Sequence, residues 1–269
     1  MKSFEFTKMV ASGNDFIVIK EPLKLPVSLK EFTKKVCDRK FGIGADGLLV
    51  VEKSRSADAK MRIFNADGSE AEMCGNGARC FAYFLAALRK PHAANLKFET
   101  KAGIINAEVN KESVKIKLTE PHSLKFNISI LINGRRMKVN LINTGVPHTV
   151  VFVDGLENID VFGLGKQIRR HKQFFPAGTN VNFVEVSGNN SIKIRTYERG
   201  VEDETLACGT GSVASALITS CLVASCGKIN VHTQGGEVLK VYFDKVDNKF
   251  NNIWLEGTAS IVYKGEYYV

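Results

Sequence analysis

The stretch GSEAEMCGNGARCFAYFLAALRK, residues 68–90, has a counterpart half a chain later in VEDETLACGTGSVASALITSCLVAS, residues 201–225. Each copy has an acidic lead-in, one cysteine, a Gly-x-Gly and then a long run of mostly apolar residues. A helix that is apolar on nearly all faces is normally buried in a core. The sequence therefore predicts two central helices, each beginning beside a cysteine, Cys74 or Cys208.

The spacing of the two copies indicates an internal repeat. Positions 74 and 208 lie half a chain apart in a sequence of 269 residues, and three more blocks match in the same order near this offset. These blocks are 12–19 with 144–151, 44–52 with 178–186, and 61–68 with 195–202. Four matched blocks in one order indicate two similar halves. We expect domains at 1–120 and 121–260, joined by the linker 119–123, and a last strand, 261–269, that could return to the first domain.

Outside the two central helices the pattern is mainly that of strands. Short runs that alternate apolar and polar residues predict strands, and apolar residues at helical spacing predict helices at 29–40 and 161–171. The predicted strands are 4–10, 16–19, 48–52, 61–65, 96–100, 103–109, 113–118, 137–145, 148–153, 180–186, 192–200, 229–234, 237–243 and 253–267. This mixture predicts an α+β fold.

Composition excludes several classes of protein. The formal net charge is +9, but the basic residues are scattered and no nucleic-acid-binding motif is present, so we expect no nucleic-acid partner. No segment has the ~18 uninterrupted apolar residues of a membrane span, and the first ten residues lack a cleavable apolar run. Six cysteines without a Cys-x-x-Cys indicate reduced thiols and no metal site. The sequence thus predicts a soluble, cytoplasmic protein.

The repeated cysteines have two interpretations. A helix N-terminus carries free N–H groups and the positive end of the helix dipole, which favour an anion and lower the pKa of a thiol. Alternatively, each cysteine is a small core residue beside a helix. Duplication favours the first, because two thiols on opposite faces of one carbon can exchange the roles of acid and base and invert a stereocentre. The glycine-rich helix ends would then hold the α-carboxylate.

Six segments together resemble the diaminopimelate epimerase family over nearly the whole chain. They are KMVASGNDFIVI, FGIGADG, IFNADGSEAEMCGNGARC, NTGVPHTV, GTNVNF and YERGVEDETLACGTGS. The resemblance implies two pseudo-symmetric domains, each a mixed β-barrel-like sheet around a central helix. It also implies a cofactor-independent interconversion of LL- and meso-diaminopimelate, on the route to lysine and peptidoglycan precursors. The oligomeric state stays open, with a homodimer as one option.

The resemblance also assigns roles to residues of this sequence. It implies that Cys74 and Cys208 are the acid/base pair, and that backbone groups at four helix-end residues hold the reacting carboxylate: Gly75, Asn76, Gly209 and Thr210. It implies five substrate-binding residues, the last four mainly at the distal amino-acid end: Asn14, Asn65, Asn180, Glu198 and Arg199. Arg199 can grip a carboxylate with two bonds, and Glu198 can accept from an ammonium group.

Taken singly, these polar residues have plainer explanations. Asn14 and Asn65 are common turn residues, and Glu198 with Arg199 could form a surface ion pair. The chain also departs from the family at two positions. Gly47 stands where some members have glutamine, and Val146 where many have asparagine, so we leave both out of the predicted binding set.

His148 matches a histidine of the family. It either orders the site or is a hydrogen-bonded histidine beside a strand. The other histidines are scattered in the sequence.

Other functions compete with the epimerase interpretation. A related cofactor-independent racemase, such as a proline racemase, would not need Glu198, Arg199 and three asparagines for a second zwitterionic end. A thiol oxidoreductase would be expected to carry Cys-x-x-Cys, which is absent. A non-catalytic amino-acid-binding protein has no need of a thiol at both helix ends. A pyridoxal-dependent racemase needs a Schiff-base lysine, which the sequence alone does not exclude.

Overall fold

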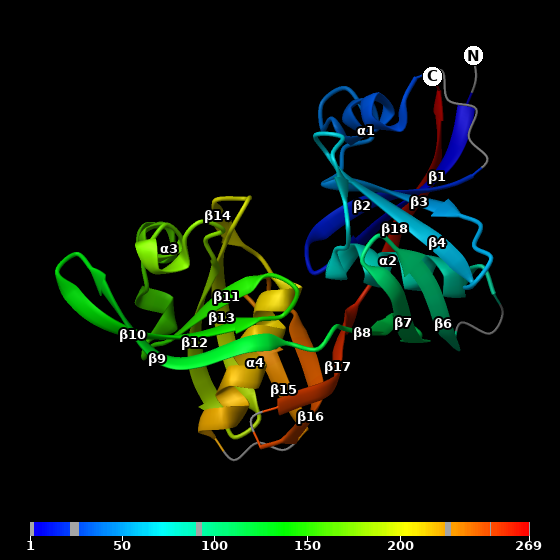
Figure 1. The fold of residues 1–269 in the computed structure, drawn as a ribbon. Coiled ribbons are helices and arrows are strands. Elements are labelled where there is room, and N and C mark those ends of the chain that lie inside the picture. The colour runs from blue at the N-terminus through cyan, green and yellow to red at the C-terminus, as the bar shows by residue number, and fades with distance from the viewer. Residues whose placement is uncertain (1–2, 22–26, 90–92, 224–226, 248, 269) are drawn as a thin grey trace. The chain divides into compact units, whose positions relative to one another are not determined.

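The computed structural model describes residues 3–21, 27–89, 93–223, 227–247 and 249–268. The chain divides into two compact units, the first made of Met1–Ile116 and Gly257–Val269, the second of Lys117–Glu256. Cys226 and the last residues expected in each central helix lie outside the described residues. Figure 1 shows the helices and strands of each unit.

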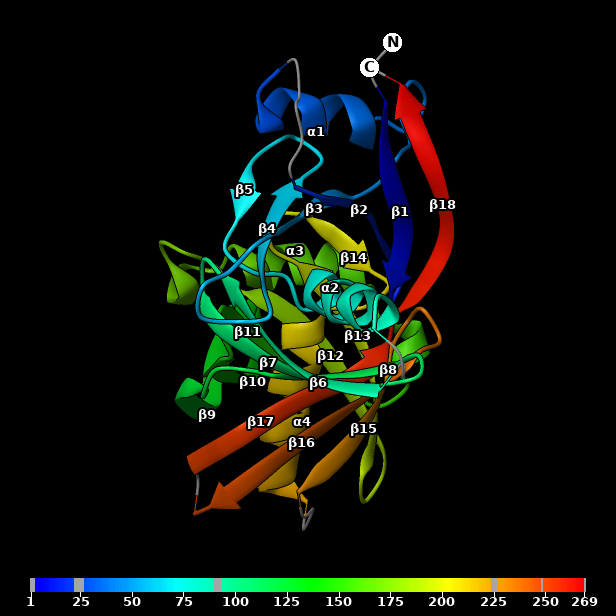
Figure 2. The same cartoon turned by 90° about the vertical axis from the view of Figure 1, so that its right-hand side faces the viewer.

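The first unit contains two helices and nine strands among its described residues. The helices are α1 (Leu29–Cys37) and α2 (Gly75–Ala87). The strands are β1 (Ser3–Ala11), β2 (Asn14–Lys20), β3 (Gly47–Glu52), β4 (Ala59–Asn65), β5 (Glu70–Ala71), β6 (Ala93–Thr100), β7 (Gly103–Asn110), β8 (Ser113–Lys117) and β18 (Ser260–Tyr268). β1 pairs with both β2 and β18, and Figure 2 shows β1 and β18 side by side.

The second unit has the same kind of composition. Its strands are β9 (His122–Ile132), β10 (Arg135–Asn143), β11 (Pro147–Phe152), β12 (Asn180–Gly188), β13 (Ser191–Glu198), β14 (Asp203–Thr205), β15 (Lys228–His232), β16 (Val238–Val246) and β17 (Lys249–Thr258). Its helices are α3 (Val161–Arg169) and α4 (Gly209–Leu222), with 3₁₀ turns at Leu156–Asn158 and Lys172–Phe174.

The two units share one order of strand pairing. In the first, β1–β2 is antiparallel, β2–β3 parallel, β3–β4 and β4–β5 antiparallel, β4–β6 parallel, and β6–β7–β8 antiparallel. The second repeats this sequence from β10–β11 through β16–β17. β9 pairs with β10 as β18 pairs with β1. The last strand of the first unit is therefore the equivalent of β9.

Each unit packs its strands around one apolar helix. In the first unit, α2 contacts β1, β2, β3, β4, β6, β7 and β18, and in the second, α4 contacts β10, β11, β12, β13, β15 and β16. Residues 211–220 of α4 are all buried, as the apolar sequence predicted. No helix within the described ranges is long and apolar enough to cross a membrane.

The strand predictions need correction at several places, and the short strands β5 and β14 were not predicted. The strand β9 was not predicted, and it begins at His122, inside the segment expected to be a linker. The strand expected over 253–267 is two strands, because β17 pairs with β16 whereas β18 pairs with β1. The break falls at Ala259, whose backbone N–H donates to the carbonyl oxygen of Glu112 (3.0 Å).

Candidate active site

Cys74 and Cys208 occupy the same position at the start of α2 and α4. Each is the N-cap residue with an extended backbone, at φ −141° and ψ 126° for Cys74 and φ −114° and ψ 112° for Cys208. The first helical bonds run from Ala78 N to Cys74 O (2.8 Å) and from Ser212 N to Cys208 O (2.9 Å). The amides of the three residues after each cysteine have no acceptor within the helix. Each unit thus offers an anion-favouring helix end beside a thiol.

The second glycine of each Gly-x-Gly is required by packing. A Cβ added to Gly77 would lie 2.9 Å from the Cδ1 atom of Ile63, and one added to Gly211 would lie 2.3 Å from Oδ1 of Asn182. Real Cβ atoms do not approach other atoms this closely. These glycines therefore let the sheet pack directly against the first turn of each helix.

In the first unit, Asn14 lies beside the thiol of Cys74. The Sγ atom of Cys74 is 3.8 Å from Oδ1 of Asn14, and Nδ2 of Asn14 donates to Oδ2 of Asp46 (2.7 Å). Arg39 bridges Asp46 (2.7 Å) and Asp15 (2.8 Å). Burial would raise the pKa of Asp15, but its hydrogen bonds, that from Arg39 first, hold it well below its usual value. Asn14 is thus anchored by a network of ionised groups.

The other two predicted asparagines of this unit differ in exposure. Asn65 ends β4, is exposed, and donates from Nδ2 to Oγ of Ser69 (3.0 Å). Asn76 is buried in the first turn of α2, where its Oδ1 accepts from Nη2 of Arg79 (2.9 Å). The side chain of Asn76 therefore supports the helix end, and its backbone amide is the group placed at the N-terminus.

In the second unit, Asn180 and Arg199 are held together. Oδ1 of Asn180 accepts from the backbone N–H of Arg199 (2.8 Å), and its Nδ2 donates to the carbonyl oxygen of Pro147 (3.2 Å). The Arg199 guanidinium donates from Nη1 to the carbonyl oxygen of Ala177 (3.0 Å). The Asn180 side chain thus fixes the backbone of the turn after β13, and the Arg199 guanidinium is tied separately to Ala177.

Glu198 makes a contact that the sequence did not predict. Its carboxylate accepts hydrogen bonds from the Thr205 hydroxyl (3.0 Å) and from the thiol of Cys208. Burial raises the pKa of the Glu198 carboxyl, and these two hydrogen bonds partly oppose that effect. Sγ of Cys208 also lies 3.6 Å from Oγ1 of Thr210. A carboxylate that contacts the thiol directly can accept or return its proton.

His148 is fully buried on β11. Its Nδ1 lies 3.1 Å from Nδ2 of Asn182, which also donates to the carbonyl oxygen of Thr149 (3.1 Å). Asn182 is thus the donor, and the imidazole is neutral with its proton on Nε2. Burial, with a smaller effect of the Arg199 cation, lowers the pKa of His148 to about 3.

This histidine should make stability depend on pH. The unfolded chain binds a proton at His148 below its ordinary pKa of about 6.5, whereas the folded chain does not until about pH 3. The stability it contributes is therefore complete above pH ~6.5 and is lost progressively as the pH falls toward ~3. Between pH 7.5 and 5 we expect the free energy of unfolding to fall by about 2 kcal/mol through this group. Urea denaturation at several pH values measures the free energy of unfolding of the wild type and of His148→Gln. Its slope against pH between 7.5 and 5 should be seen only in the wild type.

His122→Gln is the matched control, because His122 is exposed and bonds only to the neighbouring Ser123 among the described contacts. It should keep the wild-type slope. An unchanged slope in His148→Gln would contradict the buried, neutral assignment.

Of the two departures from the family, Gly47 has a structural reason. It begins β3, and a Cβ there would lie 2.7 Å from the carbonyl oxygen of Phe64. A larger side chain would require β3 and β4 to separate. Nothing in the structure explains Val146.

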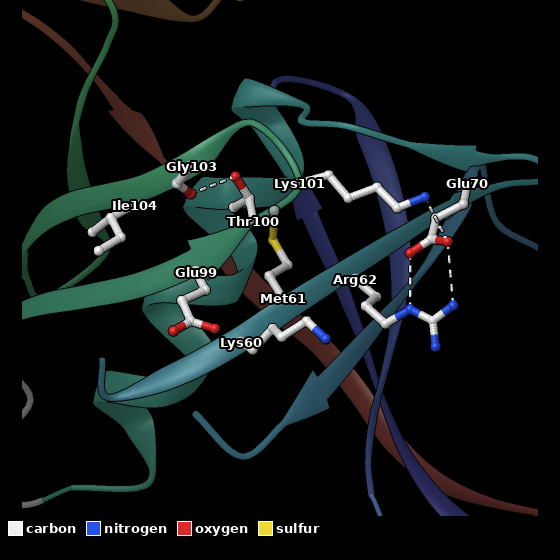
Figure 3. A pocket seen from close by; sticks show the side chains of 9 residues that line it. All are labelled: Lys60, Met61, Arg62, Glu70, Glu99, Thr100, Lys101, Gly103 and Ile104. Carbon is white, nitrogen blue, oxygen red and sulfur yellow. Dashed lines mark hydrogen bonds and ion pairs between the residues drawn. The ribbon is translucent and has the colours of Figure 1, made fainter. Parts of the chain in front are cut away.

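A cavity of about 390 Å³ lies in the first unit (Figure 3). It is lined by Lys60, Met61, Arg62, Glu70, Glu99, Thr100, Lys101, Gly103 and Ile104, and by none of the predicted site residues. Its basic side chains are already paired: Lys60 with Glu52 (2.7 Å), and Arg62 and Lys101 with Glu70 (2.8 Å each). Within the described ranges, no group of three or more His, Cys, Asp or Glu residues could hold a metal ion.

Comparison with known proteins places these features in a family. The family model for diaminopimelate epimerase matches residues 6–123 and 140–262. Proteins named diaminopimelate epimerase are 45% identical in Hydrogenobaculum sp. (96% of each chain covered) and 43% in Methanocella arvoryzae (99% and 97%). One from Archaeoglobus fulgidus is 42% identical, with 97% of this chain and 95% of that one covered.

Solved structures share the fold at lower identity. A PhzF-family phenazine biosynthesis protein of Bacillus anthracis matches with a TM-score of 0.77 at 20% identity, over 100% of both chains. A hydroxyproline epimerase of Agrobacterium vitis matches with a TM-score of 0.72 at 13% identity, over 98% of this chain and 92% of that one. These matches confirm the two-domain α+β fold that the sequence predicted.

Proposed function

Because the chain belongs to the diaminopimelate epimerase family, we propose that it interconverts LL- and meso-diaminopimelate with Cys74 and Cys208 as its acid and base. The observation that carries this proposal is the repeated geometry: each cysteine is the N-cap of a buried helix, followed by a Gly-x-Gly. Such a pair offers two equivalent proton carriers, one from each unit, and two equivalent sets of backbone N–H groups for a carboxylate.

The proton transfers then follow a symmetric course. One cysteine, as thiolate, takes the α-proton from one face of the substrate carbon. The electron pair left on that carbon is stabilised by the carboxylate, held at the helix N-termini, and is reprotonated on the opposite face by the other thiol. The first cysteine is now a thiol and the second a thiolate, so the reverse reaction begins from the state that the forward reaction leaves. The cycle needs no redox step.

The carboxylate of Glu198 affects the proton transfers at Cys208. It accepts a hydrogen bond from the Cys208 thiol, and Thr205 orients it. We infer that Glu198 keeps Cys208 protonated until reprotonation is required. On the other side, the amide of Asn14 contacts Cys74 and carries no charge.

The remaining predicted residues favour a substrate with a second amino-acid end. Arg199 and Asn180 lie together, and Asn65 is exposed at the end of β4. A guanidinium with nearby amides suits a second carboxylate and ammonium, which a monocarboxylate amino acid such as proline does not have.

The decisive experiment is incubation of the purified protein with LL-diaminopimelate in D2O. We expect the meso isomer to form with deuterium at the inverted α-carbon, with no pyridoxal-type absorbance and with activity retained after exhaustive chelation. Unchanged stereochemistry, or loss of activity on chelation that a metal restores, would overturn the proposal. Turnover of proline at the same rate would overturn the assignment of a site for a second amino-acid end.

A further inference from the structure

Each unit contains the same bidentate arginine–glutamate pair just ahead of its cysteine. In the first unit, Nε and Nη2 of Arg62 donate to the two carboxylate oxygens of Glu70 (2.8 and 3.2 Å). In the second, Nε and Nη2 of Arg195 donate to those of Glu204 (both 2.7 Å). Figure 3 shows the Arg62 guanidinium facing the Glu70 carboxylate edge to edge. The same two nitrogens are used in both units.

The pairs also occupy the same register of the sheet. Glu70 lies opposite Phe64 in the β4–β5 ladder, and Glu204 lies opposite Tyr197 in the β13–β14 ladder. In each case the arginine is two residues before that partner on the longer strand. This diagonal position is within reach of long side chains. Each glutamate precedes its cysteine by four residues.

The third nitrogen of each guanidinium is fixed separately. Nη1 of Arg62 donates to Oε1 of Glu52 (3.2 Å), while Nη1 of Arg195 donates to the carbonyl oxygens of Leu156 (3.1 Å) and Ile159 (3.0 Å). The arginine thus binds to two segments at once.

These pairs differ from ordinary surface ion pairs, which contribute little to stability. All four paired side chains, those of Arg62, Glu70, Arg195 and Glu204, are between 16% and 27% exposed. The hydrogen bond from Arg62 first, and that from Lys101 as well, lower the pKa of Glu70 to about 2, so it is ionised at neutral pH.

The strands that carry the glutamates are too short for their ladder hydrogen bonds alone to fix their position. β5 has two residues and β14 has three, and β5 is joined to β4 at only two positions. Two residues separate the end of each strand from a cysteine N-cap. In the second unit the effect extends further, because Thr205, next to Glu204, donates to Glu198, which accepts from the Cys208 thiol. A side-chain anchor at this point fixes the turn that follows.

We propose that Arg62–Glu70 and Arg195–Glu204 are positioning pairs, each of which holds the turn that presents the cysteine of its own unit at the helix N-terminus. This inference rests on the proposed function of the two cysteines as proton carriers. Loss of one pair should displace one thiol from the helix amides and leave the other thiol unaffected. A displacement of about 1 Å can reduce a rate about 100-fold.

The test measures each thiol separately in Glu70→Gln and Glu204→Gln. The variants are alkylated with iodoacetamide across pH, and the modification of each cysteine is followed by peptide mapping. We expect the pH midpoint for Cys74 to rise by about half a unit or more in Glu70→Gln only, and that for Cys208 in Glu204→Gln only. We also expect kcat to fall about 10- to 100-fold in each, with KM changed less than threefold.

Matched controls remove an ion pair that does not lead to a cysteine. Asp58→Asn breaks the pair with Arg89 (2.7 Å) in the first unit, and Glu256→Gln breaks the pair with Lys240 (2.8 Å) in the second. Both should keep the wild-type alkylation profiles and kcat. If a glutamine variant does not fold, Arg62→Lys or Arg195→Lys replaces it, since these keep the charge and remove only the two-bond grip.

The outcomes separate this inference from the proposed function. Glutamine variants that behave like the controls, or that shift both cysteines equally, would overturn the positioning role. If the unit-specific shifts appear but proteins without either cysteine still epimerise diaminopimelate, the pairs position the turns as inferred and the proposed function is wrong.

Discussion

Replacing either repeated cysteine by alanine is expected to remove epimerisation almost completely. Each thiol serves one face of the carbon, so Cys74→Ala and Cys208→Ala should each lose about 10²- to 10⁴-fold or more in kcat. The remaining thiol can still remove and return a proton on its own face. In D2O each single variant should therefore exchange the α-proton of one stereoisomer with retention, and the double variant should exchange neither. NMR of the α-position with chiral separation measures both quantities.

The matched controls are two other cysteines on the same helices. Cys80 lies on α2 and Cys221 lies on α4, both away from the helix start. The control variants are Cys80→Ala and Cys221→Ala. Both should retain epimerisation within a small factor. Inversion at a normal rate in Cys74→Ala or Cys208→Ala would exclude the two-thiol mechanism.

Replacing Arg199 by lysine should produce the second large effect. Lysine keeps the charge but cannot make the planar two-bond contact with a carboxylate. Truncating a buried, hydrogen-bonded charge typically costs about 2–5 kcal/mol, so losing the two-bond contact while the charge stays should cost about 2 kcal/mol, a fall in kcat/KM of roughly thirtyfold. Steady-state kinetics with LL-diaminopimelate test this, and thermal unfolding checks that the fold is kept.

Arg170→Lys is the control for that experiment. Arg170 is 62% exposed, and its one ion pair within the described part of the chain is a long contact, 3.9 Å, with Glu202. It should change kcat/KM less than twofold. If both arginine variants retain normal kinetics, the distal-carboxylate role of Arg199 is wrong.

The sequence was most informative where its signal was local and duplicated. An apolar run with a preceding cysteine and Gly-x-Gly is recognisable within one segment, and α2 and α4 begin directly after Cys74 and Cys208. Strand β9 was missed although residues 124–130, LKFNISI, alternate apolar and polar residues as a strand does, because the segment just before them was interpreted as a linker. The Asn-Gly dipeptide at Asn133 and Gly134, which is typical of a tight hairpin, was a further signal at its end. Both residues have the positive φ that such a hairpin requires (50° and 75°).

The contacts around the candidate site could not be predicted in the same way. Asp46 anchors Asn14 from 32 positions along the chain, and Arg39 reaches both Asp15 and Asp46. Sequence shows which carboxylates exist but not which of them face one another after the strands pair. The link from Glu198 to Cys208 was missed for a related reason, because Glu198 ends β13 and Cys208 caps α4, so their contact depends on how these two elements pack.

The position of β18 has a consequence for synthesis of the protein on the ribosome. The second unit is continuous in sequence, so all of its strands are available once Thr258 has emerged. The first unit is started first but finished last, because β1 lacks its second partner until Ser260–Tyr268 has been translated. During most of elongation the edge of β1 is open to pairing with other chains. Nascent chains that stall before residue 260 are thus the ones most exposed to aggregation and to capture by chaperones.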